Sequence, residues 1–208
     1  PVFMHCAAGG AIAAFVAYAA MGWYPSFLIR SHGMGTAEIG LWLGLIMGGA
    51  GAVGMLLGGF LADKFGALHT PWYLWTVAVG LLLAVPFSAA SFLVSDPYSA
   101  MMLFAVQLMV ANAWLGPTVA QIQSIVELRM RAISVAVLFF ITNLVGLGLG
   151  PWIIGALSDA LQERFAHDSL RWSLFVVGFF GLWSAWHYYR AGRLLEANLL
   201  SARPQLTK

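Results

Sequence analysis

The sequence predicts an all-α integral membrane protein with six transmembrane helices arranged as two inverted three-helix repeats. Composition is the first observation: 61% of the residues are hydrophobic, 9% are charged, and the mean hydropathy is +0.85. A soluble domain carries about 25% charged residues, so lipid must solvate most of the exterior. The other observations are a series of long apolar segments and a short phrase that ends two of them.

Each apolar segment is long enough to cross a bilayer core of about 30 Å, which takes about 20 helical residues. Short polar connections separate the segments and leave no room for a soluble domain. The first segment is too long, and too poor in basic flanks, for a cleavable signal peptide. We assign residues 1–190 to the transmembrane bundle and 191–208 to a C-terminal tail. The predicted spans are residues 2–29, 38–61, 70–94, 99–124, 132–157 and 170–190.

Basic residues are divided unevenly between the two ends of the predicted bundle. One end holds Lys64, Arg129, Arg131, Arg190, Arg193, Arg203 and Lys208, and the other holds Arg30, Arg164 and Arg171. The positive-inside rule therefore predicts that the first end, with the C-terminus, is cytoplasmic. The net charge is only +2 and dispersed, so we expect contacts with lipid headgroups and none with nucleic acid. The tail is expected either to lie on the cytoplasmic surface as an amphipathic segment or to extend the last helix.

Two spans end in the same phrase, Gly59-Phe60-Leu61-Ala62-Asp63 and Gly155-Ala156-Leu157-Ser158-Asp159. The copies lie three spans apart, on spans that cross the membrane in opposite directions. Inverted repeats of this kind build many secondary transporters. In the first copy, the glycines are expected to let helices approach closely, Asp63 to cap the next helix, and Lys64 to stay in the headgroup layer. The alternative is an ordinary polar turn.

Residues 59–66 match the loop pattern G-x-L-x-D-x-x-G, and on this motif the chain resembles the major facilitator superfamily. Three further stretches are similar to its spinster-like members: Gly116-Pro117, the loop Arg129-Met130-Arg131-Ala132, and the run Gly146–Pro151 with its following Gly155-x-Leu157-x-Asp159. The resemblance covers helices seven to twelve of a twelve-helix fold. It implies alternating-access transport of a small organic or lipid-like solute. The conformational motif would comprise Gly59, Asp63, Lys64, Gly66, Gly155, Asp159, Arg129 and Arg131.

Polar residues within spans indicate a solute pathway. Gln107, Trp114 and Gln121 are spaced by seven in the fourth span, so at 3.6 residues per turn they form one stripe, with Thr118 between the last two. Tyr18 and Asn143 are the other candidates, whereas Asn112 is expected to point to another side of the fourth span. The alternative for each residue is a hydrogen bond between helices, worth about 0.6 kcal/mol.

No Asp, Glu, Lys or Arg lies deep within a predicted span. Proton coupling usually needs such a group in the pathway, so we expect any coupling residue in N-terminal helices that this sequence lacks. The chain begins with Pro1, which favours a fragment whose partner is a missing N-terminal half or a second copy. Short loops without glycosylation sequons suit a bacterial inner membrane. A non-transporting scaffold or truncated half-gene product remains the alternative.

Catalytic and metal chemistry are not expected. The histidines are scattered over loops and span ends without ligand spacing, and no cofactor is indicated. Ser88 and Ser91 have no histidine at a matching depth, which disfavours an intramembrane enzyme. Gly40, Gly44 and Gly48 recur every four residues on one face of the second span, and we expect this face to pack against another helix.

Overall fold

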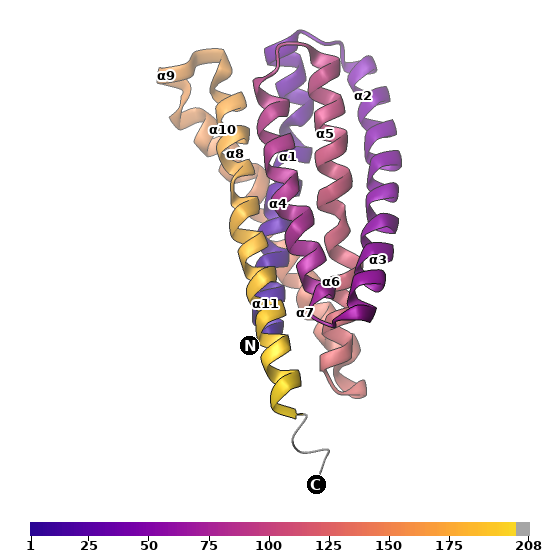
Figure 1. The fold of residues 1–208 in the computed structure, drawn as a ribbon. Coiled ribbons are helices and arrows are strands. Elements are labelled where there is room, and N and C mark those ends of the chain that lie inside the picture. Colours follow the sequence, from indigo (N-terminus) through magenta and orange to yellow (C-terminus); the bar gives the residue numbers. More distant parts are fainter. Residues whose placement is uncertain (203–208) are drawn as a thin grey trace.

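The computed structural model describes residues 1–202, which form helices and turns and contain no β-strand (Figure 1). Longer helices carry the passes across the bundle, and short helical segments interrupt or join them. The elements are α1 (Val2–His32), α2 (Thr36–Leu45), η1 (Ile46–Ala50), α3 (Gly51–Leu68), α4 (Trp72–Leu93), α5 (Pro97–Ala111), η2 (Asn112–Trp114), α6 (Leu115–Ile125), η3 (Leu128–Met130), α7 (Arg131–Asn143), η4 (Leu144–Leu149), α8 (Gly150–Ala160), α9 (Gln162–Phe165), η5 (Ala166–Asp168), α10 (Ser169–Gly178) and α11 (Phe180–Ala202).

Five of the six predicted membrane passes are confirmed. Five continuous helical stretches are long and apolar enough to span a bilayer: Val2–His32, Thr36–Leu68, Trp72–Leu93, Pro97–Ile125 and Leu128–Ala160. The sixth predicted pass, which is not among these stretches, corresponds to α10 and α11, separated by Phe179. The chain is therefore a multi-pass integral membrane protein.

The described start of the chain, the α3–α4 turn, the α6–α7 turn and the end of α11 lie at one end of the bundle, the lower end in Figure 1. The structure therefore groups the two basic connections with the end of α11, as the sequence predicted, whereas Arg203 and Lys208 of the predicted tail lie outside the described residues. At the opposite end, α1 stops at Gly33, whose φ of 66° is left-handed. The N–H groups of Gly33 and Met34 donate to the carbonyls of Ile29 and Leu28, which closes the last turn of the helix.

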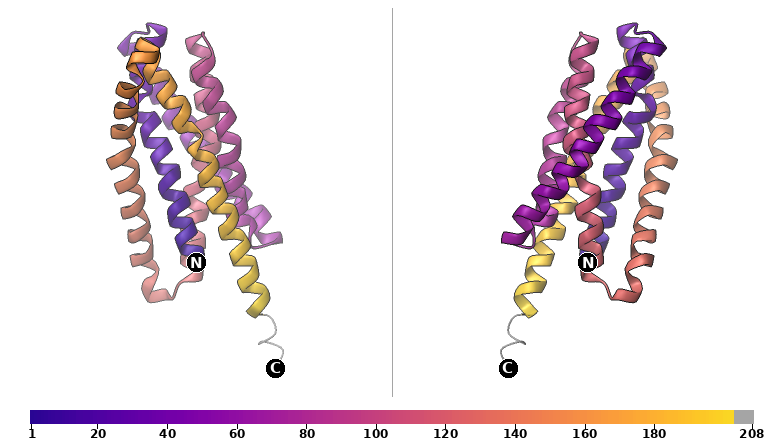
Figure 2. Two further views of the ribbon diagram at one scale, coloured as in Figure 1. Left: turned by 90° about the vertical axis from the view of Figure 1, so that its left-hand side faces the viewer. Right: turned by 90° about the vertical axis from the view of Figure 1, so that its right-hand side faces the viewer.

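The second and fifth passes share an interruption that supports the inverted repeat. Each contains a π-helical segment near its middle, η1 in the second and η4 in the fifth. Pro151 follows η4, and a proline lacks an N–H and clashes with the carbonyl four residues earlier, here that of Leu147. The two passes run in opposite directions, and the lower ends of α3 and α7 lie at opposite edges of the bundle (Figure 2).

Small residues let α1 pack closely against its neighbours at the centre of the bundle. A Cβ added to Gly9 would meet the Tyr188 ring at 2.9 Å, and one added to Gly146 would meet the Tyr18 ring at 2.6 Å. Packing of this kind stabilises helix association in lipid, where the hydrophobic effect between helices is absent. Two apolar clusters result, one centred on Tyr24 toward the Gly33 end of α1 and one on Tyr188 toward the other end.

The expected packing role of Gly40, Gly44 and Gly48 is wrong within the described chain, because nothing lies within 4 Å of a Cβ added at these positions. Gly54 and Gly58 make the close contacts of this pass instead, against Met109 and Ala113. Gly40, Gly44 and Gly48 lie on an exposed face that no other helix of the described chain covers. The π-helical segment η1 inserts an extra residue, so this face does not continue into α3.

The expected cap of α4 by Asp63 is also wrong. Helix α3 continues past Asp63 to Leu68, and α4 begins after Pro71 without a side-chain cap. Asp63 and Lys64 therefore lie exposed on a helix rather than at a helix junction. The last helix, α11, runs without a break past residue 190 to Ala202, as in the alternative in which the tail extends the last helix.

Candidate solute-binding cavity

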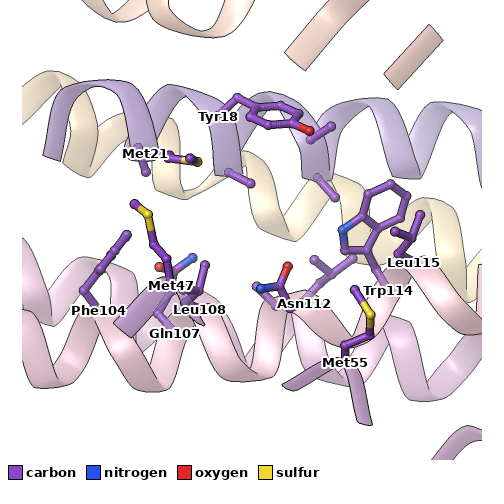
Figure 3. Close-up of a pocket in the computed structure, with 16 residues that line it drawn as sticks. Tyr18, Met21, Met47, Met55, Phe104, Gln107, Leu108, Asn112, Trp114 and Leu115 are labelled. Atoms are coloured by element: carbon purple, nitrogen blue, oxygen red, sulfur yellow. The ribbon is translucent and has the colours of Figure 1, made fainter. Parts of the chain in front are cut away.

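A cavity of about 280 Å³ lies between α1 on one side and α5, η2 and the start of α6 on the other (Figure 3). Side chains from η1, α3 and α4 complete it. Its wall contains residues of both apolar clusters, so it lies where the two halves of the core meet. The lining residues are Ala13, Ala14, Ala17, Tyr18, Ala20, Met21, Met47, Met55, Leu81, Phe104, Gln107, Leu108, Ala111, Asn112, Trp114 and Leu115.

The cavity brings together three of the residues that the sequence singled out: Tyr18, Gln107 and Trp114. Tyr18 projects from α1, and the other two project from the opposite wall (Figure 3). The Trp114 ring packs against α1 at Gly10, where an added Cβ would meet a ring carbon at 3.0 Å. A phenol, an amide and an indole therefore face one space that is otherwise apolar.

Asn112 also lines this cavity, contrary to the expectation that it points elsewhere. Asn112 lies about 140° around an ideal helix from Gln107, so the cavity wall extends beyond the face that Gln107 marks. A Cβ added to Gly51 of α3 would lie 3.3 Å from the Asn112 amide nitrogen, which places Asn112 beside the α3 part of the wall. The spacing of polar residues in one pass does not show where α3 packs, and for this reason Asn112 was missed.

Sequence reasoning also missed three methionines in the cavity wall: Met21, Met47 and Met55. Unbranched thioether side chains adapt to irregular shapes and are common at surfaces that bind varied ligands. They come from α1, η1 and α3, so no local sequence pattern would have grouped them. No charged side chain lines the cavity within residues 1–202, which suits an uncharged solute with a few hydrogen-bonding groups.

Thr118 and Gln121 continue the stripe of Gln107 and Trp114 but do not line the cavity. The Thr118 side chain is fully buried, and its hydroxyl lies 3.0 Å from the Tyr188 hydroxyl of α11. Gln121 is 4% exposed, and its amide donates to the Ser124 hydroxyl at 2.8 Å. Both residues therefore satisfy their hydrogen bonds inside the bundle.

Asn143 lies elsewhere, on an exposed face of α7. Its amide nitrogen donates to the Phe139 carbonyl at 2.8 Å, one turn earlier in the same helix. The structure therefore leaves Asn143 outside the cavity.

The residues of the predicted conformational motif occupy both ends of the bundle. At the lower end, a Cβ on Gly66 would clash with the Tyr73 ring, so this glycine lets α4 fold back onto α3. Gly59 has open space around it. In the α6–α7 connection, at the same end of the bundle, exposed Arg129 donates to exposed Glu127 at 2.8 Å. Exposed residues of the motif are Asp63, Lys64, Arg129, Arg131 and Asp159. At the upper end, a Cβ added to Gly155 of α8 would lie 3.3 Å from a carbon of the Trp23 ring.

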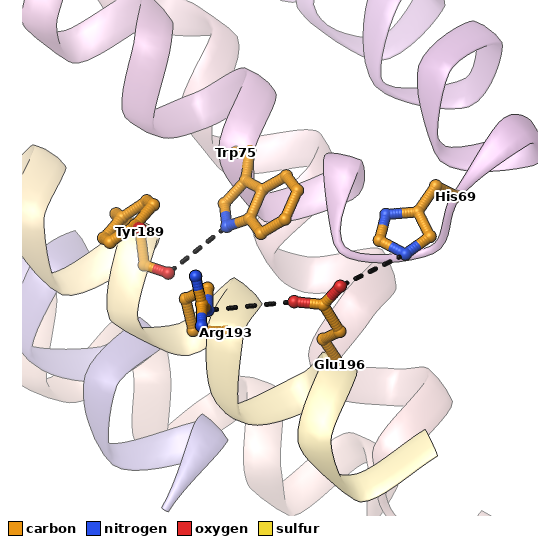
Figure 4. A network of polar contacts seen from close by, with 5 residues as sticks. All are labelled: His69, Trp75, Tyr189, Arg193 and Glu196. Carbon is orange, nitrogen blue, oxygen red and sulfur yellow. Dashed lines mark hydrogen bonds and ion pairs between the residues drawn. The ribbon is translucent and has the colours of Figure 1, made fainter. Parts of the chain in front are cut away.

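The α3–α4 turn that follows the motif is tied to α11 by polar contacts (Figure 4). The His69 Nε2 lies 3.5 Å from a Glu196 carboxylate oxygen, and Arg193 lies 3.8 Å from the other oxygen. The Trp75 indole donates to the Tyr189 carbonyl at 3.3 Å. These contacts hold the end of α11 beside the turn.

Three features are typical of half of a twelve-helix membrane transporter fold. The helices follow the order of six predicted passes, π-helical segments mark an inverted repeat, and a cavity with a few polar side chains lies between the first and fourth passes. The comparisons with known proteins agree. The chain is 31% identical over 205 residues to an MFS-type efflux pump of Mycolicibacterium smegmatis. The matched region covers 95% of this chain and 48% of that protein. No protein-family model matches the chain.

Two solved structures have the same fold, both of a bacterial homologue of the human lysosomal transporter Spinster. The inward-facing, unoccupied form superposes with a TM-score of 0.83 at 29% identity, over 93% of this chain and 48% of that one. The inward-facing, occupied form gives 0.80 at 28% identity, over 93% and 49%. The chain therefore has the fold of one half of these transporter structures and is similar in sequence to an MFS-type protein, and it spans about half the length of the relatives it matches.

Proposed function

We propose that this chain is the C-terminal half of a secondary transporter that moves a small organic or lipid-like solute across a membrane by alternating access. The observation that carries the proposal is the cavity between α1 and α5, in which Tyr18, Gln107, Asn112 and Trp114 face one another across an apolar space. The cavity lies between the first and fourth passes, which suits a solute site around which two helical bundles rock against each other. The similar efflux pump and the similar Spinster homologue support transport as the activity.

In this proposal, Gln107, Asn112 and Tyr18 supply hydrogen bonds to the solute, and Trp114 supplies an aromatic wall. Thr118 and Gln121 hold the lower part of the same pass in position through Tyr188 and Ser124. Asn143 lies on an exposed face of α7, where a second half would complete the pathway. No catalytic role is proposed for this chain, since Ser91 donates to the Ser88 carbonyl at 2.8 Å and both side chains are buried.

The partner in this proposal is an N-terminal six-helix half or a second copy of the chain. The exposed motif residues around Asp63 and Arg129 would contact it and change partners during the cycle. The positive-inside rule supports a cytoplasmic location for the lower end of the bundle and for the C-terminus. The membrane we propose is a bacterial inner membrane, where the short connections between passes are common.

Efflux of an uncharged amphipathic dye tests this function. The full reading frame that contains the chain is expressed in a bacterium without its own efflux pumps, and the cells are loaded with Nile red. Faster dye loss than in vector-only cells is expected. Gln107→Ala should slow it about fivefold, because one lost neutral hydrogen bond costs about 1 kcal/mol.

The matched control is Gln123→Ala, which changes the same residue type in the same pass but outside the cavity wall. It should leave the rate unchanged. Equal rates in the two variants would remove Gln107 from the solute site. No efflux from correctly inserted wild-type protein would favour the non-transporting scaffold.

A further inference from the structure

A second hollow, on the outer surface of the bundle, is almost entirely apolar. It is a groove of about 200 Å³ between α3 and α4, which meet at the lower end in Figure 1. Leu57 and Leu83 form its walls and are 45% and 49% exposed, and Met109 and Ala113 form its floor. Gly54, Gly58 and Gly80 let α3 and α4 lie directly against the backbone at the base of the groove, because an added Cβ at each would clash with Met109, Ala113 or Val110. On a membrane protein, an outer apolar groove faces lipid chains.

One polar atom in this groove has no partner. The Thr76 hydroxyl oxygen is buried and forms no hydrogen bond with the described residues. A helical threonine commonly bonds a carbonyl of the preceding turn, and an unsatisfied buried hydroxyl costs about 1–3 kcal/mol. In this rotamer the oxygen is also shielded from the groove, so rotation about χ1 must turn the hydroxyl outward before a groove occupant with an acceptor oxygen at this level removes that cost.

One end of the groove lies beside a positively charged side chain, which would attract an anionic headgroup. Lys64 is exposed and lies three residues after the groove residue Leu61, so it continues the same stripe of α3. Asp63 lies about 200° around the helix from Leu61 and so faces away from the groove. Trp72 closes this end on α4, and tryptophan prefers the headgroup level of a bilayer.

The helix rise orders these groups by depth. Thr76 lies about 6 Å from Trp72 along the axis of α4, and Leu83 lies about 10 Å beyond Thr76. A cation and an indole, then a lone hydroxyl, then apolar walls match in turn a phosphate, an ester carbonyl and an acyl chain. This is the order of groups in one leaflet of a glycerophospholipid bilayer.

We propose that the α3–α4 groove binds a single glycerophospholipid with an anionic headgroup. One acyl chain lies over Met109 and Ala113, an ester carbonyl accepts from Thr76, and the phosphate meets Lys64. The site is separate from the solute cavity, because the lining residues of the two do not overlap. Its occupancy stabilises the hairpin that carries the conformational motif.

Native mass spectrometry tests the site directly. Full-length protein is released from vesicles of equal phosphatidylglycerol and phosphatidylcholine content, and the retained lipids are counted. The wild type should retain one phosphatidylglycerol in preference to phosphatidylcholine. Lys64→Gln should lower phosphatidylglycerol retention at least threefold, whereas Arg30→Gln, at the other end of the bundle, should not.

Two further variants separate the groove from the general lipid surface. Val79→Trp fills the groove, and Leu82→Trp adds the same ring to an exposed position outside it. Only the first should abolish retention. Thr76→Val should lower retention, and in detergent without phosphatidylglycerol it should not lower the free energy of unfolding, because its hydroxyl has no bond within the described protein to lose.

Retention by Val79→Trp at the wild-type level would overturn the site, as would equal retention of both lipids regardless of Lys64. Size-exclusion chromatography and circular dichroism show which variants fold. If Val79→Trp fails to fold, Thr76→Val and Lys64→Gln still decide the outcome, since neither enlarges a side chain. If the folded wild type retains phosphatidylglycerol but does not export the dye, the transport proposal alone is contradicted and the lipid site is still supported.

Discussion

The hydrogen bond between Thr118 and Tyr188 gives an asymmetric prediction. Both side chains are fully buried, and their hydroxyl oxygens lie 3.0 Å apart. Thr118 donates its one hydroxyl hydrogen to the Trp114 carbonyl, so the Tyr188 hydroxyl donates to Thr118. This contact is the only hydrogen bond of the Tyr188 hydroxyl within the described chain. Removing one partner therefore differs from removing the other.

Tyr188→Phe leaves Thr118 bonded to the backbone, so it should cost about 0.6 kcal/mol of unfolding free energy, the average for such bonds in membranes. Thr118→Val leaves the Tyr188 hydroxyl buried without a partner, which costs about 1–3 kcal/mol. Replacing both partners by apolar groups of the same shape is nearly neutral. Adding Tyr188→Phe to Thr118→Val should therefore restore stability.

The four proteins are compared by reversible unfolding in lipid bicelles, and the double-mutant cycle gives the coupling energy. With a nearly neutral double variant and single losses of about 0.6 and about 1–3 kcal/mol, the coupling energy should be about −1.6 to −3.6 kcal/mol. Additive losses, or a double variant less stable than Thr118→Val, would show that the two hydroxyls do not depend on each other.

Three other changes have defined outcomes. Gly58→Val should destabilise the protein by about 1–3 kcal/mol in the same unfolding assay, because its Cβ would clash with the backbone of Ala113; unchanged stability would mean that α3 can move away. Asp63→Asn should slow the transport cycle while leaving solute affinity intact, and a pure loss of affinity would contradict that role. Asp96 accepts from the Ser99 N–H at 2.7 Å, which holds the pKa of Asp96 below its usual range; its stabilising effect should be present at neutral pH and disappear as the pH falls through that lowered pKa, and Asp96→Asn should remove this acid dependence in unfolding measured from pH 7 to 3.

The passes, the inverted repeat and the family resemblance were predictable from sequence because each rests on long or repeated patterns. Hydropathy over about 20 residues is insensitive to local detail. The motif that ends at Asp63 and recurs at Asp159 identifies the repeat from sequence, whether or not the helices bend. Predictions of these features are therefore not affected by small errors in helical register.

The site was less predictable because it depends on which helices surround each pass. Asn112 lies about 140° around an ideal helix from Gln107, yet both residues line the cavity. Gly54 and Gly58 meet Met109 and Ala113, whereas nothing in the described chain lies near Gly40, Gly44 or Gly48. Hydropathy and helical period do not encode these neighbours.

Contacts between distant residues were beyond reach for a different reason. Thr118 and Tyr188 are 70 positions apart, and each alone is an unremarkable residue of an apolar span. The stripe of Gln107 and Trp114 was correctly grouped at one cavity, but its continuation at Thr118 and Gln121 meets other helices. Only the packing of α6 against its neighbours distinguishes a solute contact from an internal hydrogen bond.

The proposed function requires the space between α1 and α5 to be a water-accessible solute cavity, and thiol accessibility measures this property. Gln107→Cys is treated in membrane vesicles with a membrane-impermeant maleimide, with Leu82→Cys on the exposed outer surface of α4 as control. The native Cys6 is fully buried and provides a low background. We predict that Gln107→Cys is labelled, that transported dye protects it, and that Leu82→Cys stays unlabelled. A Gln107→Cys variant that is folded but inert from both sides of the membrane would contradict the account.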